Sequence, residues 1–246
     1  MHRRKFIQNL LLSAGAFSLF PLANLEAQRP SFCGAEHFPY QLPPLKYGLV
    51  NFEPFLDFLS LEVHYYQIHK NYARQLNEVL EHLGLQDLSI EQILKSRVLE
   101  GKIAEYAVLK NAAGGYYNHC MFWDTITPFS NPVPSRWRDI ISLHFGSWDL
   151  FEQQFFERAH NWVGSGWIWL VKQSTGNLII TCTHDEDNPL MPFVPEQGIP
   201  VLGIDLWEHS YYSHFLDQRN KYITVIWNYI DWQNVLSRYG QVFSYT

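Results

Sequence analysis

Apolar residues recur at three- and four-residue steps between positions 60 and 83 of the chain. This spacing places them on one face of a helix, because an α-helix has about 3.6 residues per turn. Ser60 is a suitable N-cap and Gly84 a suitable stop, so the pattern predicts one long helix over 60–83. A short helix is predicted from Ser89, and a second long helix over about 102–123. The apolar positions of the first helix are Leu61, Tyr65, Ile68, Tyr72, Leu76, Val79, Leu80 and Leu83.

The second half of the chain mixes helical and strand patterns after a proline-rich break. Pro128, Pro132 and Pro134 interrupt any helix, and we interpret this segment as the linker between two domains, 28–127 and 128–246. The predicted fold class is α+β, with an N-terminal long-helix hairpin domain and a C-terminal α/β domain containing a small three-stranded antiparallel sheet. The C-terminal elements are helices over 135–145 and 148–161, strands over 166–172, 178–183 and 201–206, and helices starting at Glu208 and Asp231.

The first 27 residues have the features of an export signal. Arg3, Arg4 and Lys5 form a basic head, and an apolar stretch follows from about residue 10 to residue 22. That stretch is too short to span a bilayer, and the paired arginines resemble a twin-arginine signal, which exports folded proteins. We therefore predict an exported, periplasmic protein, with a membrane anchor or an arm packed on the fold as the alternative. No other apolar run is long enough to span a membrane, so no membrane association is expected after signal removal.

Composition narrows the class of protein. The chain has 246 residues, of which 47% are hydrophobic, and a formal net charge of -6. This composition excludes an intrinsically disordered chain, and the acidic balance argues against a nucleic-acid partner, because phosphate contacts require clustered lysine and arginine. The 11 histidines and the 16% aromatic content are high, so histidine chemistry is the first to consider.

Three histidines and one aspartate stand out as candidate metal ligands. His64 and His119 lie on the two predicted long helices, Asp205 ends the last predicted strand, and His209 follows four residues later. Three imidazoles and one carboxylate form a ligand set suited to manganese or iron, and zinc is also possible. Each histidine taken alone is more often an ordinary core or surface residue, so spacing by itself makes only a weak case for a metal site.

The sequence around these four residues resembles the iron/manganese superoxide dismutase family in four blocks that follow the family's order. The resemblance implies that the four residues hold one Mn or Fe ion per subunit, with a solvent molecule as fifth ligand. It also implies an enzyme that disproportionates superoxide to dioxygen and hydrogen peroxide while the metal cycles between two oxidation states. The blocks are Ser60-Leu61-Glu62-Val63-His64-Tyr65, Asn111-Ala112-Ala113-Gly114-Gly115-Tyr116-Tyr117-Asn118-His119, Gly164-Ser165-Gly166-Trp167 and Asp205-Leu206-Trp207-Glu208-His209.

The resemblance also assigns roles to residues around the metal site. Tyr72 matches the tyrosine that guards the family's substrate channel. Arg219 matches an arginine near the entrance, where it would attract the superoxide anion; a structural salt bridge is its alternative role. Glu208 matches a residue that bonds His209 of the partner subunit, and Tyr212 also lies at this contact. The resemblance therefore implies a two-fold homodimer.

The channel of this chain departs from the family pattern at one position. The family has a second channel histidine four residues after its first ligand, and that position is Ile68 here. Tyr212 therefore loses its expected partner across the dimer. His69 is the neighbouring residue, but it lies about 100° further round an α-helix, so it is not a simple replacement.

A second departure concerns the glutamine that the family places against the metal-bound solvent. Iron-type enzymes supply it from the position of Gly115, whereas manganese-type enzymes have glycine there and supply it from a loop, where this chain has Glu186. Gly115 leaves a hole beside His119 that another group must fill, and His184 is a further candidate for the loop position. An ionised Glu186 accepts but cannot donate a hydrogen bond. The alternative function is therefore a dismutase-like metal-binding protein with weak or lost turnover.

Overall fold

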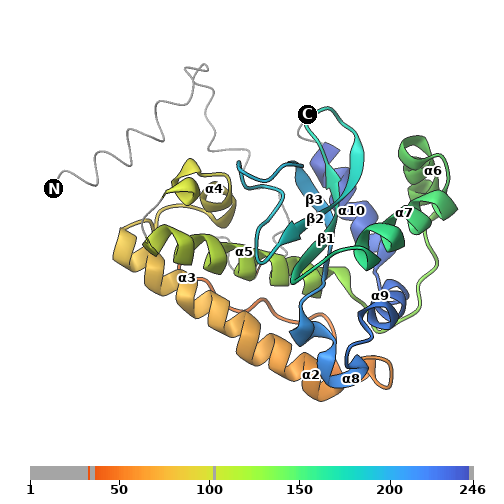
Figure 1. Ribbon diagram of the computed structural model, residues 1–246, viewed down its shortest axis with the longest axis horizontal. Coiled ribbons are helices and arrows are strands. Elements are labelled where there is room, and N and C mark those ends of the chain that lie inside the picture. The colour runs from red at the N-terminus through yellow and green to blue at the C-terminus, as the bar shows by residue number, and fades with distance from the viewer. Residues whose placement is uncertain (1–32, 34–36, 102–103, 244–246) are drawn as a thin grey trace.

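The computed structural model describes residue 33, residues 37–101 and residues 104–243. The predicted export signal over residues 1–27 lies outside this part of the chain. The N-terminal half is built on two long helical segments that pack side by side (Figure 1). The predicted helical hairpin is therefore confirmed. The first segment comprises α2 (Phe58–Val63), a π-helical turn (His64–His69) and α3 (Lys70–Leu83), and the second segment is α5 (Ala104–Thr125).

The first long segment differs from the predicted helix at two places. Its N-cap is Asp57, because Asp57 Oδ2 accepts hydrogen bonds from the backbone N–H and the hydroxyl of Ser60, at 2.8 and 2.6 Å. Ser60 thus lies in the first turn and is not the cap. The π-helical turn His64–His69 then interrupts the α-helix, and each residue of such a turn advances by less than about 100°. The prediction of one uninterrupted α-helix over 60–83 is wrong at these positions.

Short elements connect and precede the long segments. The helix predicted from Ser89 is α4 (Ile90–Leu94), and the side chains of Ser89 and Gln92 form a reciprocal capping box at its start. A 3-10 turn, Arg97–Glu100, leads from α4 toward α5, and another, Leu49–Phe52, precedes α2.

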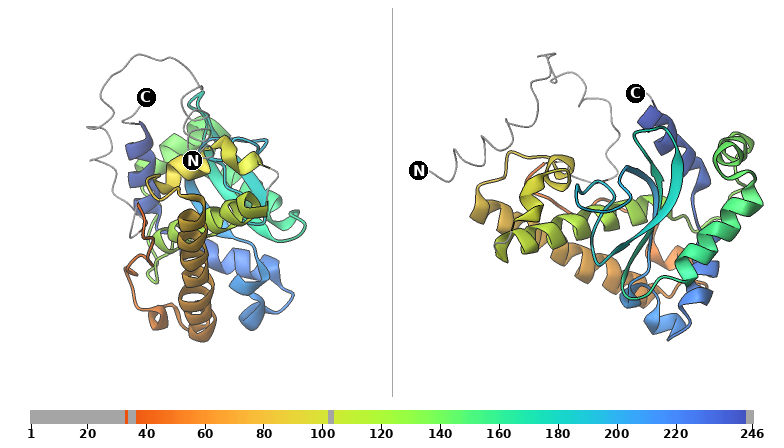
Figure 2. Two further views of the ribbon diagram at one scale, coloured as in Figure 1. Left: turned by 90° about the vertical axis from the view of Figure 1, so that its left-hand side faces the viewer. Right: turned by 45° about the horizontal axis from the view of Figure 1, so that its top comes forward.

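The C-terminal half contains the predicted sheet, flanked by helices on both sides (Figure 2). The strands are antiparallel in the order β2-β1-β3, which confirms the predicted fold class. Every residue of β1 is buried, because β1 is the central strand and α5 and α7 pack against its neighbours β3 and β2. The elements are α6 (Ser135–Phe145), α7 (Trp148–His160), β1 (Gly166–Lys172), β2 (Leu178–His184) and β3 (Ile199–Asp205).

The end of the chain folds back onto α5. Backbone hydrogen bonds from Thr127 N to Tyr229 O (2.7 Å) and from Asp231 N to Thr125 O (2.8 Å) join the two domains. The helix predicted from Glu208 is divided into short pieces, whereas the one predicted from Asp231 forms. Among the described residues no helix is both long and apolar enough to cross a membrane. The elements after β3 are a 3-10 turn (Glu208–Ser210), α8 (Tyr212–Phe215), α9 (Arg219–Trp227) and α10 (Trp232–Phe243).

Candidate metal centre

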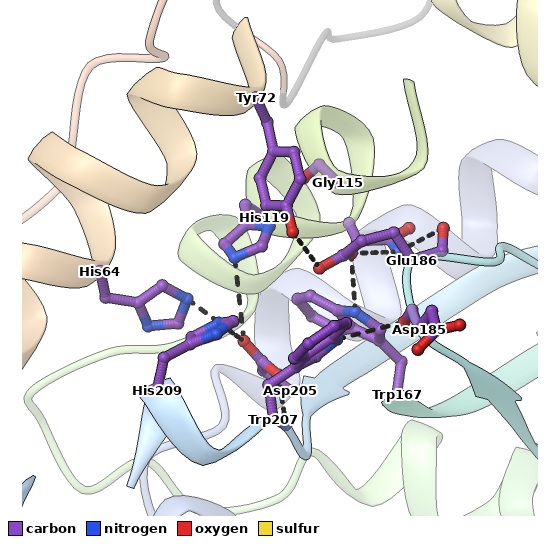
Figure 3. Close-up of polar contacts among 11 residues, drawn as sticks. His64, Tyr72, Gly115, His119, Trp167, Asp185, Glu186, Asp205, Trp207 and His209 are labelled. Atoms are coloured by element: carbon purple, nitrogen blue, oxygen red, sulfur yellow. Dashed lines mark hydrogen bonds and ion pairs between the residues drawn. The ribbon is translucent and has the colours of Figure 1, made fainter. Parts of the chain in front are cut away.

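The structure brings the four predicted ligands together from four different elements (Figure 3). His64 comes from the π-helical turn, His119 from α5, Asp205 from the end of β3 and His209 from the following 3-10 turn. One ligand atom from each residue lies within 4.8 Å of the other three. Asp205 Oδ2 is the common point, 3.2 Å from His64 Nε2, 3.8 Å from His119 Nε2 and 3.0 Å from His209 Nε2.

The hydrogen bonds behind the ligands direct their lone pairs into this cluster. His119 Nδ1 lies 2.7 Å from the carbonyl oxygen of Gly115. A carbonyl can only accept, so Nδ1 carries the proton and Nε2 presents a lone pair to the cluster. That Nε2 is buried and has no hydrogen-bond partner among the described residues. Asp205 Oδ1 accepts from the backbone N–H of Trp207 at 2.8 Å, which leaves Oδ2 for the cluster. These groups fit a Mn or Fe ion, which prefers nitrogen and carboxylate ligands.

Electrostatics favour the protonation states that bind a metal. Burial lowers the pKa of both His64 and His119 below the usual value for histidine, so both imidazoles are neutral. Burial by itself would raise the pKa of Asp205, but the neighbouring His209 and His64 hold it well below its usual range. Neutral imidazoles around an ionised carboxylate are the form that coordinates a cation.

Glu186 lies fully buried at the edge of this cluster (Figure 3). Its Oε1 is 3.1 Å from the Tyr72 hydroxyl, and its Oε2 accepts from Asn118 Nδ2 at 3.0 Å and from Trp167 Nε1 at 2.9 Å. Burial and the nearby charge of Asp205 raise the pKa of the Glu186 carboxyl well above its usual value in the metal-free protein. Three side chains, those of Tyr72, Asn118 and Trp167, therefore hold the Glu186 carboxyl group beside the cluster.

The hole expected beside Gly115 is filled by Tyr72. A Cβ atom on Gly115 would lie 2.4 to 2.6 Å from atoms of the Tyr72 ring, so any side chain here would displace the tyrosine. Gly114 has a similar role, because its Cβ would lie 1.9 Å from the backbone oxygen of Glu186. The two adjacent glycines inside α5 were the signal for this close approach. His184 does not fill the hole, since it is exposed and its ring packs on Trp162 at 4.2 Å.

Aromatic rings surround the ligands. The Trp123 ring lies 5.0 Å from His64, the Trp167 ring 5.2 Å from His119 and the Trp207 ring 5.6 Å from His209. Trp123 and Trp167 are buried, so bulk water is excluded from most of the ligand set. Exclusion of water strengthens the electrostatic influence of every nearby group on a bound metal.

Arg219 is the first residue of α9 and bonds the turn before β1. Its guanidinium donates hydrogen bonds to the carbonyl oxygens of Trp162 and Gly164, the latter at 3.0 Å. These bonds hold the turn that precedes β1 and Trp167. The observed contacts are therefore with backbone carbonyls, and the guanidinium remains half-buried and charged.

One neighbour of the site was not predicted from the sequence. His69 is fully buried, and its ring stacks on that of His119 at 5.5 Å, while its Nε2 lies 3.7 Å from Cys120 Sγ. Burial lowers the pKa of His69 to about 3. The π-helical turn places this side chain behind His119, and the hydrophobic pattern shows no sign of that turn. Ile68 is half-buried on the same turn.

Comparison with known proteins connects this geometry to a family. Residues 39–127 match the alpha-hairpin domain of iron/manganese superoxide dismutases, and residues 134–238 match the C-terminal domain of the same enzymes. The chain belongs to the iron/manganese superoxide dismutase family. It is 36% identical to manganese superoxide dismutase 1 of Leptolyngbya boryana over 205 residues, which are 82% of each chain. It is also 34% identical to the manganese enzyme of Acinetobacter baylyi, covering 82% of this chain and 88% of that protein.

A third relative matches this chain over almost the relative's whole length. The manganese superoxide dismutase of Buchnera aphidicola from Acyrthosiphon pisum is 37% identical over 81% of this chain and 98% of its own. Membership in the family confirms the predicted enzyme class, superoxide dismutase, and the predicted cofactor, one Mn or Fe ion. The comparisons give no support to the alternative of a related protein without turnover.

Proposed function

We propose that this chain removes superoxide with a single manganese ion held by His64, His119, Asp205 and His209. The observation that carries the proposal is the convergence of these four buried or half-buried side chains within 4.8 Å of one another. The glycine at position 115 and the manganese relatives favour manganese over iron. The test is to load metal-free protein separately with Mn and Fe and to measure superoxide removal per bound ion. Higher activity with Fe would contradict the metal assignment, and inactivity with both would contradict the function.

The mechanism assigns separate tasks to the residues around the ligands. A bound manganese ion would supply one-electron chemistry, oxidising one superoxide and reducing the next. Reduction of superoxide to peroxide also requires two protons. The Tyr72 hydroxyl is half-buried and lies 3.1 Å from Glu186 Oε1, so it is the polar side chain placed to donate a proton beside the cluster. Asn118 and Trp167 hold the other carboxyl oxygen fixed during this transfer.

Arg219 is proposed to act on the substrate before it reaches the ligands. The chain carries a net charge of -6, which repels an anion at long range. A local positive group near the entrance can still attract superoxide, because nearby charges dominate the field in a cleft. Arg219 is held in place by backbone carbonyls and keeps its full charge, which suits such a role.

A homodimer is proposed through Glu208, His209 and Tyr212. Glu208 is exposed, and its Oε2 accepts from Ser165 Oγ at 3.0 Å, which orients the carboxylate. Large apolar side chains are exposed around it on the neighbouring α2 and α8, including Leu59 (63%) and Tyr212 (57%). A face of this kind on a soluble protein is typical of an interface. Two copies related by a two-fold axis would bury it and bring Glu208 to His209 of the partner subunit.

Replacing Glu208 by alanine should weaken the dimer, because the change removes a charged partner at the centre of the proposed interface. We expect the dissociation constant to rise by about tenfold or more, measured by sedimentation velocity over a concentration series. Glu157→Ala is the matched control, since Glu157 is also exposed but lies on α7. Equal dimer stability in both variants would contradict this interface.

Export through the N-terminal segment is the last part of the proposal. Arg3, Arg4 and Lys5 followed by an apolar stretch support it. Expression of the full chain should give periplasmic protein whose N-terminus, determined by sequencing, lies near residue 28. Conversion of Arg3 and Arg4 to lysine should leave the protein in the cytoplasm. An unprocessed cytoplasmic wild-type protein would contradict the assignment.

A further inference from the structure

Strand β3 contains an extra residue four positions before the ligand Asp205. Between Leu202 and Asp205 the pairing with β1 is regular, and Asp205 lies opposite Trp167. At the start of the strand Pro200 lies opposite Val171, so the register shifts by one and Val201 has no partner residue on β1. This is a β-bulge, in which one residue is left out of the ladder and the strand changes the direction of the residues that follow.

The bulge decides which face of the sheet Asp205 occupies. Residues directly opposite each other on antiparallel strands point to the same face. Asp205 therefore points to the face of Trp167, whose indole donates to Glu186 and packs on His119. If the ladder instead ran on through Val201 in the register of Pro200, with no bulge, Ile204 would lie opposite Trp167. Asp205 would then turn to the other face, because a one-residue slip reverses every side chain. The position of Asp205 in the metal site thus depends on Val201 staying out of the ladder.

Arg238 of α10 holds this bulge. Its Nη1 donates to the carbonyl oxygen of Val201 at 2.5 Å, and its Nη2 forms an ion pair with Asp124 Oδ2. Arg238 is only 6% exposed. A buried carbonyl that has lost its place in the ladder needs another donor, and a planar guanidinium can serve this carbonyl and a carboxylate at once.

Asp124 connects the bulge to the helix that carries another ligand. It lies near the end of α5, five residues after His119. Burial would raise the pKa of Asp124, but Arg238 and Lys46 hold it below its usual value, and Lys46 Nζ lies 2.6 Å from Oδ1. Asn234 of α10 also donates to Oδ2 at 2.8 Å. The guanidinium therefore bridges the two ligand-bearing elements, α5 and β3.

We propose that Arg238 is a positioning residue for the metal centre, which keeps Asp205 facing His119 by fixing the β3 bulge against the end of α5. The proposal rests on the metal site of the proposed function, but it concerns how tightly the metal is held. Residues that orient metal ligands typically change metal affinity by about 10- to 100-fold when they are replaced. Arg238 differs from such residues in acting through the backbone of a strand.

The test compares Arg238→Met with Lys46→Met in the full chain loaded with manganese. Both substitutions remove a cation from Asp124, but only the first releases the carbonyl of Val201. We expect Arg238→Met to release manganese to a chelator about tenfold faster and to alter the visible absorption of the bound metal. Lys46→Met should keep the wild-type release rate and spectrum, even if its melting temperature falls.

Two outcomes would overturn the proposal. One is an Arg238→Met protein with a lowered melting temperature but wild-type metal release and spectrum, which is the behaviour of a purely structural ion pair. The other is an equal increase in metal release in Lys46→Met. If Arg238→Met does not fold, Arg238→Lys retains the charge but cannot bridge both partners with one planar group, so it should still release metal faster. Wild-type protein that binds manganese without removing superoxide would refute the proposed function while leaving this comparison of metal release intact.

Discussion

Replacing His209 by alanine should remove the metal, and with it the superoxide dismutase activity, from a chain that still folds. The imidazole Nε2 lies 3.0 Å from Asp205 Oδ2, at the common point of the ligand cluster. Loss of this imidazole leaves only three ligands. Buried Asp205 also loses one of the two histidines that lower its pKa. The side chain is 20% exposed and belongs to a three-residue 3-10 turn, so few core contacts are lost. Because residues behind metal ligands already change affinity by about 10- to 100-fold, loss of a ligand should exceed that range.

Metal content after dialysis against a chelator and the rate of superoxide removal check this expectation. His82→Ala is the control, because His82 is 70% exposed at the end of α3 and makes no contact with the cluster. The folded state of both variants is compared by circular dichroism before metal is added. A His209→Ala protein that retains one manganese ion per subunit and wild-type activity would refute the assignment of this ligand.

Most of the helices and strands could be predicted because each buries one face or is buried completely. The seven residues of β1 show the second case, since all are buried and only the last, Lys172, is polar, as expected for a central strand covered on both sides. The structure differs from the predicted elements where the backbone hydrogen bonding is irregular. The π-helical turn His64–His69 and the bulge at Val201 leave no mark in the pattern of apolar residues from which the elements were predicted. Pro200 hides the start of β3, because proline is an unusual strand residue away from edges and bulges.

The candidate site depended on information beyond local pattern. His64, His119, Asp205 and His209 come from four elements, and spacing along the chain cannot show that they converge. The resemblance to a family supplied that convergence. Glu186 could be identified as the loop position of the manganese-type enzymes, and the structure puts its carboxyl group against the Tyr72 hydroxyl. His69 and Arg238 could not be found in this way, since their roles follow from the irregular turn and the irregular strand themselves.

Replacing Glu186 by glutamine should raise the turnover of the manganese-loaded enzyme. Glutamine has nearly the same size and can keep the bonds from Asn118 and Trp167 through its amide oxygen. Its amide nitrogen would then take the position of Oε1, 3.1 Å from the Tyr72 hydroxyl, as a permanent hydrogen-bond donor. An ionised carboxylate at this position can only accept, and a bound cation favours the ionised form. Removing a hydrogen-bond donor aimed at a reacting site typically lowers kcat by about 100- to 1000-fold. We therefore expect the turnover of Glu186→Gln to rise by about tenfold or more.

The same substitution should change how the stability of the metal-free protein depends on pH. Burial and Asp205 raise the pKa of Glu186, so the folded protein keeps a proton that the unfolded chain releases above the ordinary glutamate value of 4.5. The wild-type protein therefore has its full stability below pH 4.5 and loses stability as the pH rises toward the folded-state pKa, by up to about 1.4 kcal/mol per pH unit. Glutamine has no proton to lose. The melting temperature of Glu186→Gln relative to wild type should thus increase from acid to neutral pH.

Both readouts use the same control, Glu196→Gln. Glu196 is a half-buried carboxylate that bonds Thr181 and Arg158 and lies outside the metal cluster. Pulse radiolysis of the manganese-loaded proteins gives the turnover, and thermal unfolding of the metal-free proteins at several pH values gives the stability. Faster turnover in Glu186→Gln but not in Glu196→Gln would show that the Glu186 carboxyl group limits the turnover of this enzyme. Unchanged turnover together with a pH-independent difference in melting temperature would mean that Glu186 neither limits the reaction nor folds with a bound proton.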